Sequence, residues 1–137
     1  MRLGACVLLD RPLDERILTV WNRRALGLCL PGGLVEDGES PLGAAIRELE
    51  EEVGLATRDL VEVYSAPHAS PRSRADRVHV FQVTDPDRGA WRPRAREAGC
   101  PISWLTREAL LAVSPFKDFY AKMFEVLALA AAAVTPR

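Results

Sequence analysis

Residues Gly33 to Leu55, GLVEDGESPLGAAIRELEEEVGL, carry the strongest structural signal in this chain of 137 residues. Ser40-Pro41 is a helix-start signal, a hydroxyl cap followed by proline at the first helical position, and Gly54 is a stop signal. Between them, apolar residues recur at helical spacing: Leu42, Ala45, Ile46, Leu49 and Val53. The stretch therefore predicts an amphipathic helix between Ser40 and Gly54.

The polar face of this helix is dense in negative charge. Glu48, Glu51 and Glu52 stand three and four residues apart, and Glu50 adds a fourth carboxylate. Like charges at this spacing repel by roughly a few tenths of a kcal/mol per pair, so a compensating cation is expected. Mg²⁺ takes oxygen ligands, keeps several waters and completes its shell with substrate phosphate. The cluster thus predicts a Mg²⁺ site, with Mn²⁺ as an alternative; an acidic face that is merely solvated is the competing interpretation.

Length and composition set the limits for the rest of the chain. The 137 residues fit one domain, 1–137, and the hydrophobic fraction of 48% with 27% charged residues is typical of a soluble globular protein. A net charge of −1 gives no general attraction to bulk nucleic acid or to an anionic membrane. Three widely spaced cysteines, no signal-peptide pattern and a short apolar tail indicate a cytoplasmic protein that does not cross a membrane.

Strands and helices are predicted on both sides of the acidic helix. Residues 5–9 and 17–21 read as two strands that form a hairpin or lie near each other, and residues 29–34 start extended and break at Pro31-Gly32-Gly33. Further strands are expected at 60–64, 78–83 and 102–105, a helical turn capped by Thr106 through Leu111, and a last helix over about 115–133. This irregular order favours an α/β or α+β sandwich with a mixed sheet.

The helix and its entry also resemble a known family. The chain runs Gly33-x5-Glu39-x7-Arg47-Glu48-Leu49-x-Glu51-Glu52-x-Gly54-Leu55, which is similar to the Nudix box Gx5Ex7REUxEExGU, with U apolar, at every fixed position. The resemblance is to the MutT-like Nudix hydrolases. It implies an α/β/α sandwich around a mixed β-sheet and Mg²⁺-dependent hydrolysis of a diphosphate linkage in a nucleoside diphosphate joined to another group.

The resemblance also implies roles for individual residues. Glu48, Glu51 and Glu52 match the positions that bind divalent metal, and the carbonyl of Gly32, just before the box, matches a backbone ligand. Arg47 and Glu39 match the pair that supports the catalytic loop, and an arginine beside three carboxylates suits a positioning role.

The general base is expected to be Glu48 or Glu52. Glu97 is the other candidate, since MutT-type members carry a glutamate on a loop before a late strand with a tryptophan, and Glu97 lies seven residues before Trp104.

Residues outside the box supply candidates for substrate contact. Four arginines are placed where they would reach substrate phosphate: Arg23 at the end of the second strand and Arg72, Arg74 and Arg77 in a polar loop, with solvated arginines as the alternative. Trp91 is expected either to stack on a base or to anchor its loop, whereas Trp104 reads as core. His68 and His79 have no spacing typical of metal ligands.

The expected partner is a small nucleotide. The substrate is a nucleoside triphosphate, oxidised or not, or a nucleotide sugar such as ADP-ribose. The family's frequent aromatic residue before Pro-Gly-Gly is replaced here by Leu28-Cys29-Leu30, so no base is specified. A non-catalytic nucleotide-binding sensor is the alternative function; an isopentenyl-diphosphate isomerase fits less well, because Cys29 and Cys100 lie in no such motif. The sequence leaves the oligomeric state open.

Overall fold

The computed structural model describes residues 1–134, and the last three residues of the predicted domain 1–137 lie outside that range. Its strands form two sheets. The first has the order β4-β1-β6-β5 and contains β4 (Gly32–Leu34), β1 (Leu3–Leu8), β6 (Arg77–Val83) and β5 (Leu60–Pro67). The second has the order β3-β2-β7 and contains β3 (Gly27–Cys29), β2 (Ile17–Asn22) and β7 (Ile102–Leu105).

The first sheet is mixed, as the sequence predicted. β1 runs parallel to β6, and the β1–β4 and β5–β6 pairs are antiparallel. The second sheet is antiparallel throughout. The strands β1 and β2 do not form a hairpin ladder; they are neighbours joined by the isolated Asp10–Ile17 bridge and by a 3.0 Å hydrogen bond from the Leu18 amide to the Leu9 carbonyl. One expected sheet is therefore divided in two at this point.

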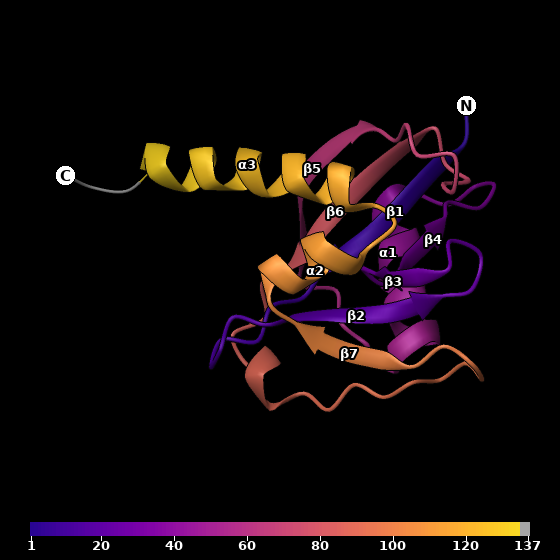
Figure 1. Ribbon diagram of the computed structural model, residues 1–137. Coiled ribbons are helices and arrows are strands. Elements are labelled where there is room, and N and C mark those ends of the chain that lie inside the picture. The colour runs from indigo at the N-terminus through magenta and orange to yellow at the C-terminus, as the bar shows by residue number, and fades with distance from the viewer. Residues whose placement is uncertain (135–137) are drawn as a thin grey trace.

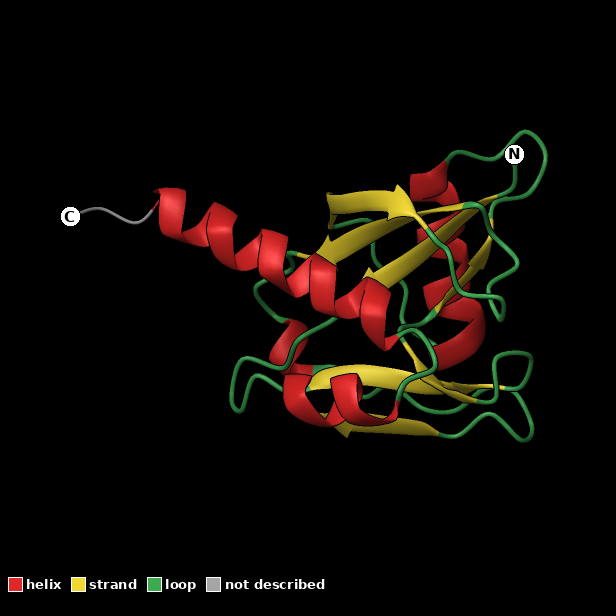
Figure 2. Ribbon diagram, turned by 45° about the horizontal axis from the view of Figure 1, so that its top comes forward, coloured by secondary structure: helices red, strands yellow, loops and turns green. Residues whose placement is uncertain are grey.

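The three helices lie on both sides of the sheets (Figure 1). The helix α1 (Pro41–Val53) covers one side, while α2 (Arg107–Val113) and the start of α3 (Lys117–Val134) cover the other. The later half of α3 projects away from the body (Figure 2). The expected α/β/α sandwich is confirmed, and the one short 3₁₀ turn within residues 1–134, Arg88–Ala90, lies in the loop after β6.

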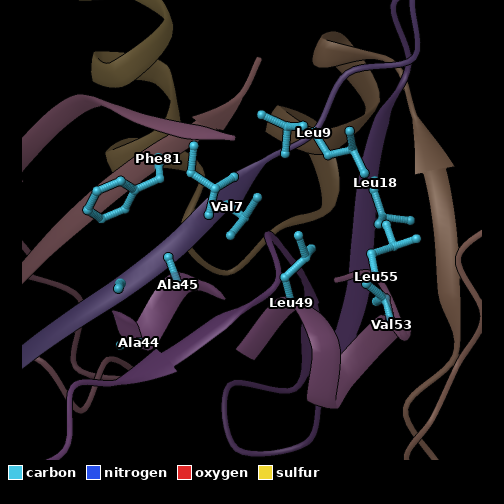
Figure 3. Close-up of a cluster of buried hydrophobic side chains, with 12 residues drawn as sticks. Val7, Leu9, Leu18, Ala44, Ala45, Leu49, Val53, Leu55 and Phe81 are labelled. Carbon is cyan, nitrogen blue, oxygen red and sulfur yellow. The ribbon is translucent and has the colours of Figure 1, made fainter. Parts of the chain in front are cut away.

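Strand alternation explains why both faces are covered. Along β1, Val7 packs into the cluster beneath α1, whereas the neighbouring Cys6 and Leu8 pack into the cluster beneath α2 and α3. The first cluster is drawn in Figure 3, where Leu49 and Val53 of α1 converge on strand residues. Strands buried on both faces read as continuous apolar runs, which is how the sequence marked them.

The ends of α1 follow the sequence signals. Ser40 Oγ accepts a hydrogen bond from the Gly43 amide at 3.0 Å, Pro41 is the first helical residue, and Gly54 ends the helix with φ at +75°. Thr106 caps α2 in the same way, accepting from the Ala109 amide at 3.1 Å. The prediction of a break over Pro31-Gly32-Gly33 was wrong in detail, because the chain turns before Gly32 and both glycines belong to β4, paired with β1.

Candidate active site

A cavity of about 790 Å³ opens between the two sheets beside α1. Its walls come from β1, the end of β2, β4, the loop between β5 and β6, and the start of α3. Carboxylates of α1 and arginines of two loops are among the residues that line it. This size is that of a site for a nucleotide-sized ligand.

Arg47 organises the acidic side of the cavity. Its guanidinium donates to both carboxylate oxygens of Glu39, from Nε to Oε2 at 2.8 Å and from Nη2 to Oε1 at 2.9 Å. Nη1 donates to Glu48 Oε1 at 2.8 Å and to Glu51 Oε2 at 3.2 Å, and Nη2 also reaches the Leu34 carbonyl at 3.1 Å. The Arg47 charge offsets part of the repulsion on the helix and ties α1 to the loop before it.

The Glu48 carboxylate lies directly against the backbone of β4. A Cβ built on Gly33 would approach Glu48 Oε1 to 2.6 Å and its carboxyl carbon to 2.8 Å. A real Cβ does not come this close, so Glu48 occupies the space that the missing side chain leaves. Gly33 is therefore needed for close approach of a carboxylate, rather than for a turn.

Glu52 is the most buried glutamate of the cluster and faces Glu48. Its Oε1 accepts a hydrogen bond from the Gly32 amide at 3.1 Å. Burial, followed by a hydrogen bond with Glu48 and that group's charge, raises the pKa of Glu52 to about 9. The negative charge of Glu97 raises it further. In the protein without metal, burial and the neighbouring Glu48 thus favour the protonated form of Glu52.

The donors present fit a divalent cation, judged by their chemistry. Glu48 and Glu52 are oxygen donors whose mutual repulsion a proton on Glu52 relieves, and a cation would take that place. Within residues 1–134, no three His, Cys, Asp or Glu side chains gather closely enough to form a complete metal cage. Mg²⁺ is commonly held by one or two carboxylates plus substrate phosphates, so a pair is enough.

The other two predicted metal ligands are placed differently. Glu51 is half exposed and its carboxylate lies against Arg47. Gly32 lines the cavity, and the contact that its backbone makes there is through its amide, to Glu52. The roles of Glu51 and of the Gly32 carbonyl as ligands stay predictions.

Glu97 reaches the same cavity from the long loop before β7. It lines the cavity, and its charge acts on Glu52. Its carbonyl accepts from the Cys100 amide at 3.1 Å, which closes a tight turn just before the strand. The structure therefore brings together Glu48, Glu52 and Glu97, the three candidates for the general base.

The arginines predicted to contact substrate divide into two groups. Arg23, Arg72 and Arg74 line the cavity, together with Arg24, which follows Arg23 at the end of the second strand. Arg77 does not line it; its Nη1 donates to Ser65 Oγ on the neighbouring strand at 2.9 Å. Arg77 is therefore not positioned for substrate contact in this structure.

Sequence reasoning missed the aromatic wall of the cavity. The residues that line it are Trp21 of β2, His68, Phe116 just before α3, and Phe119 and Tyr120 of α3. The His68 ring stacks on Phe119 with centroids 4.6 Å apart and meets Phe116 edge-on at 4.6 Å. Burial lowers the pKa of His68, so its ring is neutral and behaves as an aromatic surface at pH 7. No local signal joins Trp21 to α3, because they are distant in sequence.

Trp91 and Trp104 lie elsewhere. Both are half-buried and pack against the apolar cluster beneath α1, and Arg11 lies over the Trp104 ring at 4.5 Å. Neither lines the cavity. Of the two interpretations of Trp91, the loop anchor is the one that this packing supports. His79 pairs with Glu62 at 2.6 Å, away from the cavity.

The fold and this cavity together define an α/β sandwich protein with a ligand site that both acidic and basic side chains line. A match to the NUDIX domain covers residues 1–127, and the chain belongs to the NUDIX domain family.

Relatives and solved structures are consistent with that membership. The ADP-ribose pyrophosphatase of Methanocaldococcus jannaschii is 49% identical over 39% of this chain and 30% of its own length. The 8-oxo-dGTP diphosphatase of Proteus vulgaris is 32% identical over 56% of this chain and 61% of its own. A MutT structure from a study of the Aliivibrio salmonicida and Vibrio cholerae proteins has a TM-score of 0.69 at 22% identity, covering 93% of this chain and 96% of that one.

The matches to curated relatives are partial. The chain spans about 30% of the length of the Methanocaldococcus relative and about 60% of the Proteus one. The structural likeness extends over almost the whole chain and shows the shared fold. None of the helices within residues 1–134 combines the length and the apolar character needed to span a bilayer.

Proposed function

We propose that this protein is a Mg²⁺-dependent Nudix pyrophosphohydrolase that cleaves the diphosphate linkage of a nucleoside diphosphate joined to another group. The observation that carries the proposal is the buried Glu52 carboxyl, held against Glu48 on the wall of a nucleotide-sized cavity. A protein gains no stability by burying two repelling carboxyls, so their placement points to a cation that binds there. Mn²⁺ is the alternative ion.

The residues of the chain divide the work. When bound, the metal supplies positive charge that stabilises the diphosphate oxygens as the linkage breaks. Glu48 and Glu52, with Glu51 and the Gly32 carbonyl as further ligands, would hold it. Arg47 fixes the Glu48 carboxylate through a 2.8 Å hydrogen bond, so the oxygen atoms are set before substrate arrives. Arg23, Arg72 and Arg74 border the cavity and would contact phosphate.

A water must lose a proton as it attacks phosphorus. We assign general base to Glu48 or Glu52, with Glu97 as the other candidate, because all three reach the cavity. A carboxylate freed of its proton by a bound cation is suited to accept the proton of the attacking water.

The substrate is a small nucleotide of about the size of the cavity. A nucleoside triphosphate and a nucleotide sugar such as ADP-ribose both satisfy the chemistry, and relatives with names of both kinds exist. The aromatic wall of Trp21, Phe116 and Phe119 offers flat surfaces for a base. The free, buried cysteines Cys6, Cys29 and Cys100 support a place in the reducing cytoplasm.

A substrate screen tests the proposal. The protein is incubated with Mg²⁺ or with EDTA and a panel of canonical and oxidised nucleoside triphosphates, ADP-ribose, NADH, dinucleoside polyphosphates and nucleotide sugars, and the products are resolved by chromatography. We expect cleavage of one class that EDTA abolishes. No cleavage of any compound, together with nucleotide binding by calorimetry, would favour the non-catalytic sensor instead.

A further inference from the structure

Two loop segments on the rim of the cavity carry positive charge without any acidic residue. Residues 21–26, WNRRAL, and 69–75, ASPRSRA, contain Arg23, Arg24, Arg72 and Arg74 and no aspartate or glutamate. All four arginines are exposed and line the cavity. Within residues 1–134, no carboxylate comes within salt-bridge distance of any of them. We call this set the arginine rim.

The two segments are held together by a hydrogen bond. Arg72 Nη1 donates to the Ala25 carbonyl at 3.1 Å, across 47 residues of chain. Ala25 is buried, and the Asn22 side chain accepts from its amide at 2.9 Å, so the turn that Arg72 contacts is itself fixed. The arginines on the two segments therefore keep their relative placement.

Arg24 and Arg74 lie one and two residues from the hydrogen bond between Arg72 and Ala25, and neither they nor Arg23 takes part in it. Arg72 is occupied by Ala25, but the guanidinium groups of Arg24 and Arg74 have no described partner. The positive charge of Arg24 lowers the pKa of Arg74, with smaller contributions from burial and Arg2, so the two side chains lie within electrostatic reach of each other. Two adjacent guanidiniums form a natural binding site for a phosphate group.

Within residues 1–134, the carboxylates and the rim arginines that line the cavity do not pair with one another. The carboxylates Glu48, Glu52 and Glu97 are joined by Glu36, which lies 3.7 Å from Arg47 on the same side. The arginine rim has none. A diphosphate held at a metal accounts for the carboxylates only. A neutral sugar beyond that diphosphate would add no charge, whereas unpaired guanidiniums are matched best by further negative charge.

We propose that Arg24 and Arg74 bind a phosphate group beyond the scissile diphosphate, so that the substrate carries a chain of three or more phosphates rather than a diphosphate to a sugar. This inference rests on the proposed function for the position of the scissile linkage. Nucleoside triphosphates and dinucleoside polyphosphates share the required chemistry.

Binding without turnover tests the pair directly. Calorimetry in EDTA measures the Kd of inorganic tripolyphosphate and of ADP-ribose for the wild type and for two variants, Arg24→Gln and Arg74→Gln. The control is Arg58→Gln, which removes an exposed arginine outside the cavity. We expect Arg24→Gln and Arg74→Gln each to weaken tripolyphosphate about tenfold, with Arg58→Gln and all ADP-ribose values within about twofold of wild type. Equal Kd values in all variants, or no tripolyphosphate binding to the wild type, would overturn the proposal. Parallel weakening of ADP-ribose would also overturn it, because the pair would then contact the shared diphosphate.

Kinetics separate this inference from the proposed function and distinguish the two substrate sources. On whichever polyphosphate the screen finds cleaved, nucleoside triphosphate or dinucleoside polyphosphate, Arg74→Gln should raise KM about tenfold and leave kcat within about twofold. Cleavage confined to nucleotide sugars, with KM unchanged in Arg74→Gln, would overturn the inference and leave the proposed function standing. Arginine-dependent tripolyphosphate binding without cleavage of any compound would support the inference and overturn the proposed function.

Discussion

Arg47 donates two hydrogen bonds to the Glu39 carboxylate, eight residues earlier in the chain, at 2.8 and 2.9 Å. The same guanidinium donates to Glu48 at 2.8 Å. Glu39 in turn accepts from the Glu36 amide at 3.1 Å, so the loop before α1 and the helix are one unit. The position of the Glu48 carboxylate therefore depends on a residue that does not line the cavity.

Replacing Glu39 with glutamine tests this dependence. Glutamine keeps an acceptor but loses the charge that holds Arg47, so we expect kcat to fall about 10- to 100-fold while the fold survives. The control Glu50→Gln, on the exposed face of α1, should leave kcat unchanged. A wild-type kcat in Glu39→Gln would show that Arg47 positions Glu48 unaided.

The same pair predicts a dependence of stability on acid. The hydrogen bonds from Arg47 lower the pKa of Glu39 below its ordinary value. The folded state thus binds this proton less readily than the unfolded state, so the contribution to stability is present above pH of about 4.3 and is lost as the pH falls through the lowered pKa. Thermal unfolding of wild type and Glu39→Gln between pH 3 and 7 should converge toward the acid end; parallel curves would contradict the assignment.

Adding one carbon to Gly33 should damage the site more than the fold. The new Cβ would meet Glu48 Oε1 at 2.6 Å. The clash is with a side chain, which can rotate away, and not with backbone, which cannot. We expect Gly33→Ala to lower kcat at least about tenfold with little change in Tm. Gly89→Ala, where the Cβ would make ordinary contact with Pro12 at 3.6 Å, is the matched control. A Tm drop comparable to the loss of activity would mean that β4 itself is disrupted.

The local part of this architecture was predictable, and the sites formed by distant segments were not. Ser40, Pro41 and Gly54 set the ends of α1, and the box placed Glu48 and Glu52 on one side, because both signals act within a few residues. The strand β7 matched its predicted bounds of 102–105 for the same reason. The division into two sheets was not predicted, because it depends on pairing between strands far apart in the chain.

The cavity shows the same limit. Glu97 was assigned to it from family spacing, and Arg77 was assigned from its neighbours in a polar loop. The structure places the first in the cavity and the second on Ser65, because side chains alternate in direction once β6 begins at Arg77. Trp21 and Phe119 had no sequence signal as a wall, since each alone is an ordinary strand or helix residue.

The two halves of α3 should respond differently to mutation. Met123 is fully buried in the cluster beneath α2 and α3, whereas Leu129 is 66% exposed on the part that projects from the body. We expect Met123→Ala to cost about 2–5 kcal/mol of unfolding free energy and Leu129→Ala less than about 0.5 kcal/mol. Urea denaturation measures both. A large cost for Leu129→Ala would indicate that a partner covers the projecting half in solution.

Glu52→Gln should abolish activity and yet stabilise the metal-free protein at high pH. If Glu52 is the metal ligand and candidate base that we propose, it is needed for turnover, so kcat should fall at least about 100-fold. Its pKa of about 9 lies above the ordinary value for glutamate, so between those limits the folded state binds more protons than the unfolded state. Stability of the wild type in EDTA must then fall as the pH rises from about 4.3 toward 9.

Glutamine cannot ionise, so Glu52→Gln does not lose this stability as the pH rises. Measured in EDTA from pH 5 to 9, the Tm of the wild type should decline more steeply than that of Glu52→Gln. Saturating Mg²⁺ should restore the Tm of the wild type alone, because the ion replaces the proton between Glu48 and Glu52. Glu50→Gln, on the exposed face of the same helix, should follow the wild type throughout. Wild-type turnover in Glu52→Gln at saturating Mg²⁺ would remove Glu52 from the ligand set, and identical pH slopes would show that its carboxyl is not held protonated by burial and Glu48.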